Sequence, residues 1–457
     1  MIDVVLAEAP SAVPVRCVRE GALDGLSAAA QEAARISDFS GQSGRVLPLH
    51  AADGGLEQVL FGVGAGGEAM LARQLPAKLP AGDYRLEDAP GAWAATAVAT
   101  AFALGSYVFD RYKTDHKHGR VRLVAPEGAD LTEVRRVAHA CAMARDMVNT
   151  PANDMGPRQI EAVAREIAES AGAQVTVIEG DALLEANYPA VHAVGRAAAA
   201  HRAPRIVEMR WGESGPLIAL VGKGVVFDSG GLNIKPGGGM RIMKKDMGGA
   251  AHALALGRMI MDAKLPVRLA VITPVVENAI SGDAFRPGDV IATRKGLTVE
   301  IGNTDAEGRL ILADALARAA ELEPDLTIDL ATLTGAARVA LGPQLPPFYT
   351  DDEGLAEEIA QAAREAADPV WRMPLWSGYA EAIDSDIAQV SNDGKDWAQA
   401  GSIIAALFLK KFAPERAWAH FDIMAWNPKA APGSPVGGEA QAIRGLYRMI
   451  SRRYGGR

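Results

Sequence analysis

The chain has 457 residues, of which 49% are hydrophobic, so it is long enough for two or three domains and can bury sizeable cores. Its formal net charge of −9 argues against a constitutive nucleic-acid or anionic-membrane binder, because such binding depends on clustered Lys and Arg. With only Cys17 and Cys141, no signal peptide and no apolar run long enough to span a membrane, it is expected to be a cytoplasmic protein without a disulfide framework, a zinc finger or a membrane partner.

Residues 1–125 are expected to form a small N-terminal α/β domain without a catalytic cluster. Its clearest helical segment covers residues 92–108. Residues 126–156 are expected to be a linker, in which a helix ends in the turn 149–154, because Pro151 forbids its continuation. The linker helix covers residues 131–148, and the predicted strands of the first domain are residues 4–6, 45–49, 58–61 and 120–124.

Residues 157–457 alternate between predicted strands and helices. Pro157 stands at the start of a helix, where its missing N–H costs nothing. The continuous apolar run 217–221 is typical of a strand buried on both faces. This alternation predicts a catalytic domain of the α/β class, with a mixed, mostly parallel sheet flanked by helices and its chemistry in loops at the carboxyl ends of strands. The other predicted strands are residues 267–276, 326–330 and 418–424, and the helices are residues 158–171, 247–261, 307–322 and 354–367.

Three polar clusters flanked by glycine follow strands of this domain, at residues 222–231, 243–249 and 303–310. Four carboxylates brought together would repel one another and raise one another's pKa. The arrangement becomes stable if divalent cations lie between them, at the spacing used in two-metal hydrolysis. The four carboxylates are those of Asp228, Asp246, Asp305 and Glu307.

Each of these residues also has a purely structural interpretation. Thr304 and Glu307 have the spacing of a capping box, Asp246 could cap the helix that follows it, and Asp228 could be an ordinary turn residue. Lys223, between two glycines, could be a solvated loop lysine. The metal-site hypothesis therefore depends on all three clusters converging at one edge of the sheet.

The residues of these clusters resemble the signature segments of the leucyl aminopeptidase (cytosol aminopeptidase) family. The octapeptide Asn-Thr-Asp-Ala-Glu-Gly-Arg-Leu at residues 303–310 is a very specific match, and residues 149–154, 221–231 and 246–249 are similar to further family segments. The resemblance implies a two-metal exopeptidase that hydrolyses the N-terminal peptide bond of peptides and prefers apolar N-terminal residues such as leucine. It also implies a homohexamer.

The resemblance further implies a role for each matching residue. Lys223, Asp228, Asp246 and Glu307 would hold one metal ion, and Asp228, Asp305 and Glu307 the second, with Mn²⁺ or Zn²⁺ the expected ions. Lys235 would stabilise the developing oxyanion, and Arg309 would hold a bicarbonate ion as proton shuttle. The substrate pocket would be lined by Met243, Asn303, Thr332, Leu333 and Gly335.

Two features depart from the family pattern. Lys245 places a second positive charge beside Asp246, and it is expected to point to solvent. Residues 427–439 are rich in proline and glycine and do not match the commonest form of the family, so the preference among N-terminal residues stays open.

His252 lies inside a predicted helix and is expected to be structural.

Parts of the sequence are also compatible with three alternative functions. Residues 62–67 contain a GxGxxG pattern after a strand-like run, which could indicate a dinucleotide-binding loop. Some members of the resembled family also act as DNA-binding regulators, which would require a basic groove. A narrow-specificity dipeptidase of the Cys-Gly type could use the same site.

Overall fold

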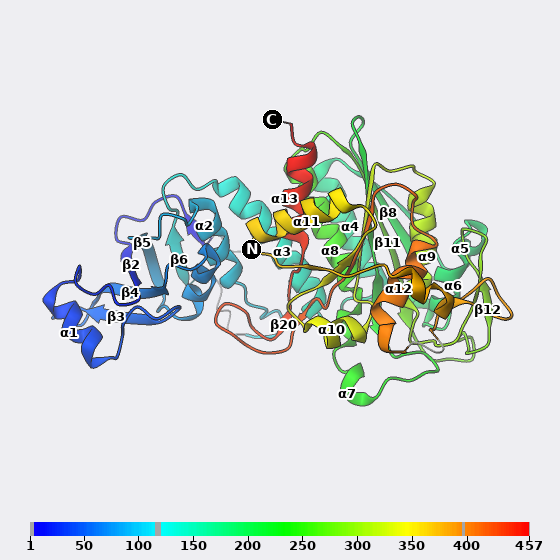
Figure 1. Cartoon of the computed structure of the whole chain (residues 1–457), viewed down its shortest axis with the longest axis horizontal. Helices are drawn as coiled ribbons and strands as arrows, with labels where there is room; N and C mark the ends of the chain where they lie inside the picture. The colour runs from blue at the N-terminus through cyan, green and yellow to red at the C-terminus, as the bar shows by residue number, and fades with distance from the viewer. Residues whose placement is uncertain (1–3, 115–119, 395–397, 457) are drawn as a thin grey trace. The chain divides into compact units, whose positions relative to one another are not determined.

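The computed structural model describes residues 4–114, 120–394 and 398–456. The chain divides into two compact units, one of residues 1–142 with 429–436 and one of residues 143–428 with 437–457 (Figure 1). The division falls inside the long helix α3 (Leu131–Asn149). No helix within the described ranges is both long and apolar enough to cross a membrane.

The first unit is built on a six-stranded sheet in the order β1-β6-β5-β2-β4-β3. Its strands pair in parallel except at β3, which runs antiparallel to β4. Helices α1 (Ala28–Ile36) and α2 (Ala95–Gly105) belong to this unit. The six strands are β1 (Val5–Leu6), β2 (Val13–Arg19), β3 (Val46–His50), β4 (Leu56–Gly64), β5 (Gly82–Glu87) and β6 (Val121–Val124).

The glycine pattern at residues 62–67 does not have the context of a dinucleotide-binding loop. Gly62 and Gly64 lie within β4, and the next element is the 3-10 helix η1 (Ala69–Ala77), which contains Pro76. A dinucleotide fingerprint needs an α-helix N-terminus at this point to receive the pyrophosphate. The dinucleotide interpretation is therefore wrong.

The second unit contains a nine-stranded sheet in the order β16-β15-β18-β14-β9-β11-β8-β7, with β10 paired to β11. The central strands β18, β14, β9 and β11 are parallel, whereas β15, β8 and β7 add antiparallel pairs. The predicted fold class, a mixed and mostly parallel sheet with helices, is confirmed. The strands are β7 (Gln174–Glu179), β8 (Arg205–Trp211), β9 (Leu217–Gly222), β10 (Gly224–Asp228), β11 (Arg268–Asn278), β14 (Leu326–Ala331), β15 (Pro347–Tyr349), β16 (Trp371–Arg372) and β18 (Trp418–Asp422).

Helices cover both faces of this sheet, as the burial of every residue of β9 requires. On one face α8 packs against β9, β11 and β14, with α4 and α13 beside it. On the other face α9 packs against β9 and β11, with α6 and α12 beside it. The helices are α4 (Pro157–Ala171), α6 (Pro189–Gly195), α8 (Gly248–Asp262), α9 (Gly308–Ala320), α11 (Glu353–Glu365), α12 (Gly401–Lys410) and α13 (Ile443–Tyr454).

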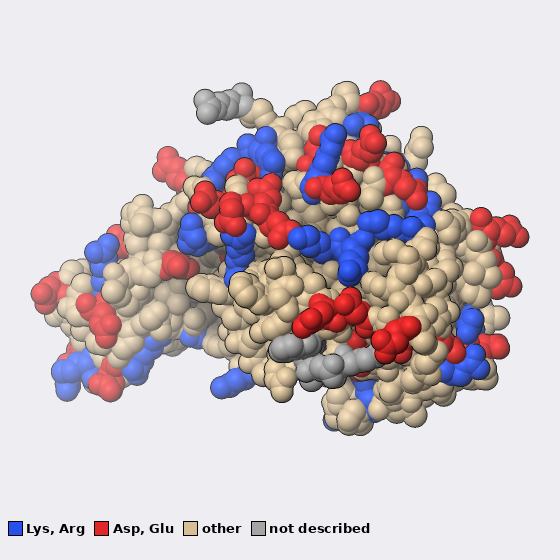
Figure 2. All heavy atoms as spheres, turned by 45° about the vertical axis from the view of Figure 1, so that its right-hand side comes forward, with Lys and Arg blue, Asp and Glu red and all other residues tan. Residues whose placement is uncertain are grey.

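Charged side chains of both signs cover the protein surface. On the face shown in Figure 2, groups of Lys and Arg side chains are bordered by groups of Asp and Glu side chains. This distribution agrees with the net charge of −9. A continuous basic surface of the kind that holds a phosphate backbone is not present on that face.

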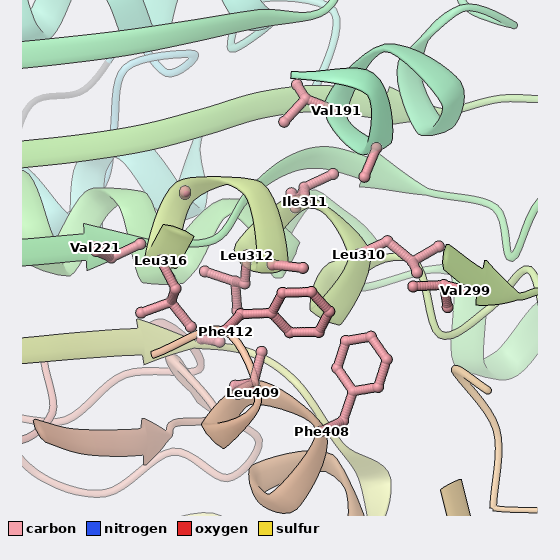
Figure 3. Packing of buried hydrophobic residues seen from close by; sticks show 14 of the residues in the cluster. Val191, Val221, Val299, Leu310, Ile311, Leu312, Leu316, Phe408, Leu409 and Phe412 are labelled. Carbon is pink, nitrogen blue, oxygen red and sulfur yellow. The ribbon is translucent and has the colours of Figure 1, made fainter. Parts of the chain in front are cut away.

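Helix α9 is fixed by apolar packing on almost every side. Leu312 and Leu316 of α9 lie against Phe412 and Leu409, which come from α12 and the turn that follows it (Figure 3). Val221 of β9 belongs to the same core. Because such cores are packed to near-crystal density, the amino end of α9 cannot shift freely. The residues just before α9 are therefore held firmly at the edge of the sheet.

Candidate active site

The candidate residues gather at the carboxyl ends of the parallel strands. Lys223 directly follows β9, Asp228 ends β10, and Thr332 directly follows β14. Asp246 lies in the 3-10 helix η3 (Met243–Met247), and Glu307 occupies the N-cap position of α9. The three clusters thus converge at the expected edge of the sheet.

Two lysines, buried Lys223 and half-buried Lys235, lie between the four carboxylates. The Lys223 Nζ atom lies 2.7 Å from Oδ2 of Asp246 and 3.0 Å from Oε1 of Glu307. Lys235 Nζ lies 2.8 Å from Oδ2 of Asp228 and 2.6 Å from Oδ1 of Asp305. The two lysine ammonium groups therefore balance only part of the charge that four carboxylates can carry.

The carboxylates offer oxygens that suit a divalent cation. One oxygen each from Asp228, Asp305 and Glu307 lies within 4.8 Å of the others. Among the described residues, Oδ2 of Asp246, Oδ1 of Asp305 and Oε1 of Glu307 are buried without a well-directed hydrogen bond and meet only the lysine ammonium groups. Buried carboxylate oxygens without donors are the ligands that hard divalent ions accept. The residues present fit a metal centre.

Burial and mutual repulsion shift the pKa values of these groups. Burial, reinforced by the Asp228 charge, raises the pKa of Glu307 to about 8. Burial and the charge of Asp246 also raise the pKa of Asp228. Burial alone would lower the pKa of Lys223, but the carboxylates of Asp246 and Glu307 outweigh it and hold that pKa above its ordinary value. Without metal, Glu307 is therefore largely protonated at neutral pH and Lys223 is charged.

The structural interpretations of single residues fail for two of the carboxylates. Neither the Glu307 side chain at α9 nor any side chain at the N-cap of α8 makes a capping hydrogen bond, so neither Glu307 nor Asp246 serves as a helix cap. Asp228 does stabilise its turn, because its Oδ1 accepts a 2.9 Å hydrogen bond from the Gly230 N–H. Its other oxygen still faces Lys235.

Two glycines let the backbone come close to side chains of the site. A Cβ atom at Gly308 would lie 2.5 Å from Cε and 2.6 Å from Nζ of Lys223. The glycine of the octapeptide is thus what allows the lysine to reach Glu307. Gly230 has a φ of +87° and also approaches Asp305 closely.

A pocket of about 250 Å³ opens beside these groups. Asp228, Asp246 and Asp305 line it together with both lysines. Glu307 lies behind this wall and is fully buried. All five residues expected to bind substrate line the pocket, as do the two expected catalytic residues: Met243, Asn303, Thr332, Leu333, Gly335, Lys235 and Arg309.

Arg309 points its guanidinium into this site from the first turn of α9. Its Nη1 donates a 2.8 Å hydrogen bond to the carbonyl of Asn392, and its Cζ lies 6.0 Å from the centre of the Phe408 ring. Its buried Nε has no acceptor among the residues that the structure describes. Burial lowers the pKa of Arg309, which nonetheless stays charged. An anion in the pocket would find an unpaired cation here.

Comparison with known proteins agrees with this geometry. The profile described as "Cytosol aminopeptidase family, catalytic domain" matches residues 142–447, and "M17 aminopeptidase, N-terminal domain" matches residues 13–126. The chain belongs to the cytosol aminopeptidase family. As a member, it is a metal-dependent aminopeptidase that acts on peptides.

Similar proteins of the cytosol aminopeptidase family cover most of the chain. It is 41% identical over 376 residues to a "Probable cytosol aminopeptidase" of Geobacter sp. (strain M21), covering 79% of this chain and 76% of the relative. The crystal structure of a cytosol aminopeptidase from Coxiella burnetii is 41% identical, with a TM-score of 0.93 and 98% of each chain covered. The bottromycin maturation enzyme BotP in complex with Mn is 34% identical, with a TM-score of 0.87, covering 97% of this chain and 100% of BotP.

Lys245 of this aminopeptidase does not point to solvent, and that expectation is wrong. Its side chain is 1% exposed and lines the pocket. The short helix η3 turns Lys245 inward, next to Asp246. Burial, opposed by the charge of Asp246 and helped by that of Arg338, lowers the pKa of Lys245 to about 8.

Two asparagines that the sequence did not single out also support the aminopeptidase site. Asn278 Nδ2 donates to Oδ1 of Asp228 at 2.9 Å and to the carbonyl of Thr304 at 3.1 Å. Asn392 Nδ2 donates to the carbonyl of Asn303 at 2.7 Å and so orders the octapeptide loop. Asn278 ends β11, so the strand-end rule could have found it, whereas Asn392 carries no comparable signal.

His252 of the aminopeptidase lies in α8 and is completely buried. Its Nδ1 lies 2.6 Å from the carbonyl of Gly248, and its Nε2 accepts a 3.0 Å hydrogen bond from the Gln441 N–H. These partners fix a neutral ring protonated at Nδ1. The interpretation of His252 as structural fits this environment.

Proposed function

We propose that this chain removes the N-terminal residue of peptides with a preference for apolar residues such as leucine, using two divalent ions per chain. The observation that carries the proposal is the pairing of Lys223 and Lys235 with four carboxylates beside a pocket. A charged lysine among buried carboxylates occupies the place that a cation would take.

The ligand sets are proposed from the carboxylate positions. Lys223, Asp228, Asp246 and Glu307 would hold one ion, and Asp228, Asp305 and Glu307 the other. Asp228, Asp305 and Glu307 support the second set, because their oxygens lie within 4.8 Å of one another. A carboxylate site accepts Mn²⁺ or Zn²⁺, and the similarity to BotP in complex with Mn favours Mn²⁺.

Bound divalent ions would supply Lewis acidity toward the scissile carbonyl and toward a water nucleophile. The chain's own residues do the rest. The Lys235 ammonium, which lies beside Asp228 and Asp305, would stabilise the oxyanion that develops on the substrate carbonyl. Arg309 would hold a bicarbonate ion, because it is a cation that lines the pocket and forms no ion pair with the described residues. Bicarbonate can serve as the proton shuttle of the reaction. No histidine is among the residues that line the pocket and could take this role.

The apolar preference rests on the residues of the pocket wall. Met243 is a flexible thioether and Leu333 an aliphatic side chain, and both line the pocket. Asn303 and Thr332 supply polar groups next to them. This combination suits a small apolar side chain next to a peptide bond.

A homohexamer in the cytoplasm is proposed with the activity. The relatives' name as cytosol aminopeptidases and the two buried thiols, Cys17 and Cys141, support a reducing compartment. Val339 and Trp376 are 90% and 60% exposed, as is typical of side chains covered in an assembly. Light scattering on the purified chain tests the hexamer. Nothing on the face in Figure 2 favours the DNA-binding alternative.

The activity is tested with leucine-p-nitroanilide and the metal-stripped protein, with and without added Mn²⁺. We expect release of p-nitroaniline only with metal. An Asp305→Ala variant should release none, because Asp305 is a proposed ligand and, at 32% side-chain exposure, is not needed for the core. No release from this substrate or from a panel of dipeptides would contradict the proposal.

A further inference from the structure

Two cations line the pocket without a hydrogen-bond or ion-pair partner among the residues that the structure describes. Lys245 is 1% exposed, yet its ammonium makes no hydrogen bond and no ion pair among the described residues. Arg338 of α10 (Gly335–Leu341) is half-buried, and its guanidinium is likewise unpaired within that part of the chain. An ammonium that lines a pocket without an acceptor from these residues is a binding group for an anion.

The neighbouring Lys244 shows that an unpaired ammonium is not a general property of this segment. Its Nζ donates a 2.5 Å hydrogen bond to the carbonyl of Asn149 and lies 5.7 Å from the centre of the Trp426 ring. Lys244 is also not among the residues that line the pocket. Lys244 therefore has a hydrogen-bond acceptor and an aromatic ring as partners, whereas the adjacent Lys245 has neither among the described residues.

The carboxylates of the pocket do not neutralise this pair of cations. Asp246 is paired with Lys223. Asp422 accepts hydrogen bonds from the N–H groups of Leu333 and Thr334 and from the Thr334 hydroxyl. None of the described carboxylates, Asp393 at the pocket wall included, forms an ion pair with Lys245 or Arg338.

The two cations lie next to the residues expected to contact substrate. Lys245 shares the helix η3 with Met243, two residues away. The Nη2 atom of Arg338 lies 3.5 Å from the position that a Cβ atom would take at Gly335. A peptide held in the pocket therefore passes within reach of both positive charges.

We propose that Lys245 and Arg338 bind a carboxylate of the peptide substrate, so that the enzyme selects peptides with an anionic group close to the scissile bond. The inference rests on the proposed peptidase function of this site. The carboxylate can come from the C-terminus of a dipeptide, which is compatible with an apolar N-terminal residue, or from an acidic N-terminal side chain, which would replace the apolar preference proposed above. In either case it would give the buried ammonium the acceptor that it lacks.

The test compares four substrates on the metal-loaded enzyme: Leu-Ala-amide, Leu-Ala with a free C-terminus, Glu-Ala-amide and Gln-Ala-amide. Leu-Ala-amide carries no carboxylate, so its hydrolysis reports the peptidase activity alone. We expect one of the two anionic substrates to exceed its uncharged counterpart, Leu-Ala-amide or Gln-Ala-amide, by at least about tenfold in kcat/KM, mainly through KM. The anionic substrate that is favoured identifies the source of the carboxylate.

Variants assign the effect to the cations. In Lys245→Met and Arg338→Gln the preference ratio should fall to near one, whereas the matched variant Lys244→Met should keep it. Equal ratios in the wild type and in Lys245→Met would overturn the inference while leaving the peptidase function intact. Absence of hydrolysis of all substrates by the wild type would instead contradict the proposed function.

Discussion

The ammonium nitrogen of Lys223 lies 2.7 Å from Oδ2 of Asp246, and the two side chains are only 3% and 4% exposed. A buried pair of this kind is stable only while each charge keeps its partner. In the proposed metal centre, a bound cation would take the place of the ammonium as the counter-ion of the carboxylates. Lys223 must then lose its proton before its nitrogen can serve as a ligand.

Metal binding should therefore release protons. At pH 7 Lys223 is charged and Glu307, with a pKa of about 8, is mostly protonated, so about two protons should leave when metal enters. Affinity for Mn²⁺ should rise as pH increases from 6 to about 8, because deprotonated ligands are needed. Calorimetry in buffers of different ionisation enthalpy measures the proton count. Lys223→Met should release about one proton fewer, and an unchanged count would contradict its role as a ligand.

Replacing the glycine of the octapeptide should disable the site. In Gly308→Ala the new Cβ atom would lie 2.5 Å from Cε of Lys223, so the lysine must move away from Glu307. We expect a loss of roughly 1–3 kcal/mol of stability from overpacking and a drop in Mn²⁺ affinity. Thermal unfolding and metal titration measure the two effects.

The control for this substitution is Gly282→Ala, where nothing lies within 4 Å of the added Cβ atom. It should leave both stability and metal affinity near their original values. If Gly308→Ala behaves like this control, the close approach of Lys223 is not needed for metal binding.

Arg309 should make the rate depend on bicarbonate. Its guanidinium is held by the carbonyl of Asn392 and otherwise faces the pocket. Removing bicarbonate from the buffer should lower kcat, and Arg309→Met should lower it by about 10²-fold and abolish the response. A bicarbonate response that survives in Arg309→Met would show that the anion acts elsewhere.

Acid should destabilise the protein through His252. Burial lowers the pKa of His252 from 6.5 to about 4, so between these values the unfolded chain binds a proton that the folded chain does not. Stability is therefore complete above pH 6.5 and falls as pH drops toward 4, by about 3 kcal/mol from this residue. The His252→Gln variant should not show this part of the loss of stability at low pH. Urea unfolding of both proteins at pH 7 and pH 4.5 checks it, and parallel losses would refute the assignment.

Buried strands were predictable because their apolar runs are continuous. The run 217–221 became β9, every residue of which is buried. Antiparallel strands near the edge of the sheet, such as β7 and β8, mix apolar residues with Thr, Glu and Arg and gave no such run. Helix α12 was missed because it is apolar on nearly all sides, which hides a helical period.

The positions of the site residues at strand ends predict that these residues lie together. They do not predict which way each side chain points. Lys223 follows the predicted strand 217–221, whereas Asp228 ends β10, a strand that the sequence did not indicate. Lys245 was predicted to face solvent, since no local pattern distinguishes it from Lys244. Only the packing of η3 decides which of the two lysines enters the pocket.

The most direct test of the account is a titration of the metal-stripped protein with Mn²⁺, following bound metal and release of leucine from a peptide in the same samples. The account predicts no activity without metal, two ions per chain at saturation, and a single ion with little activity in Asp305→Asn. Full activity without metal, or an Asp305→Asn variant that loads two ions and cleaves at the original rate, would contradict it.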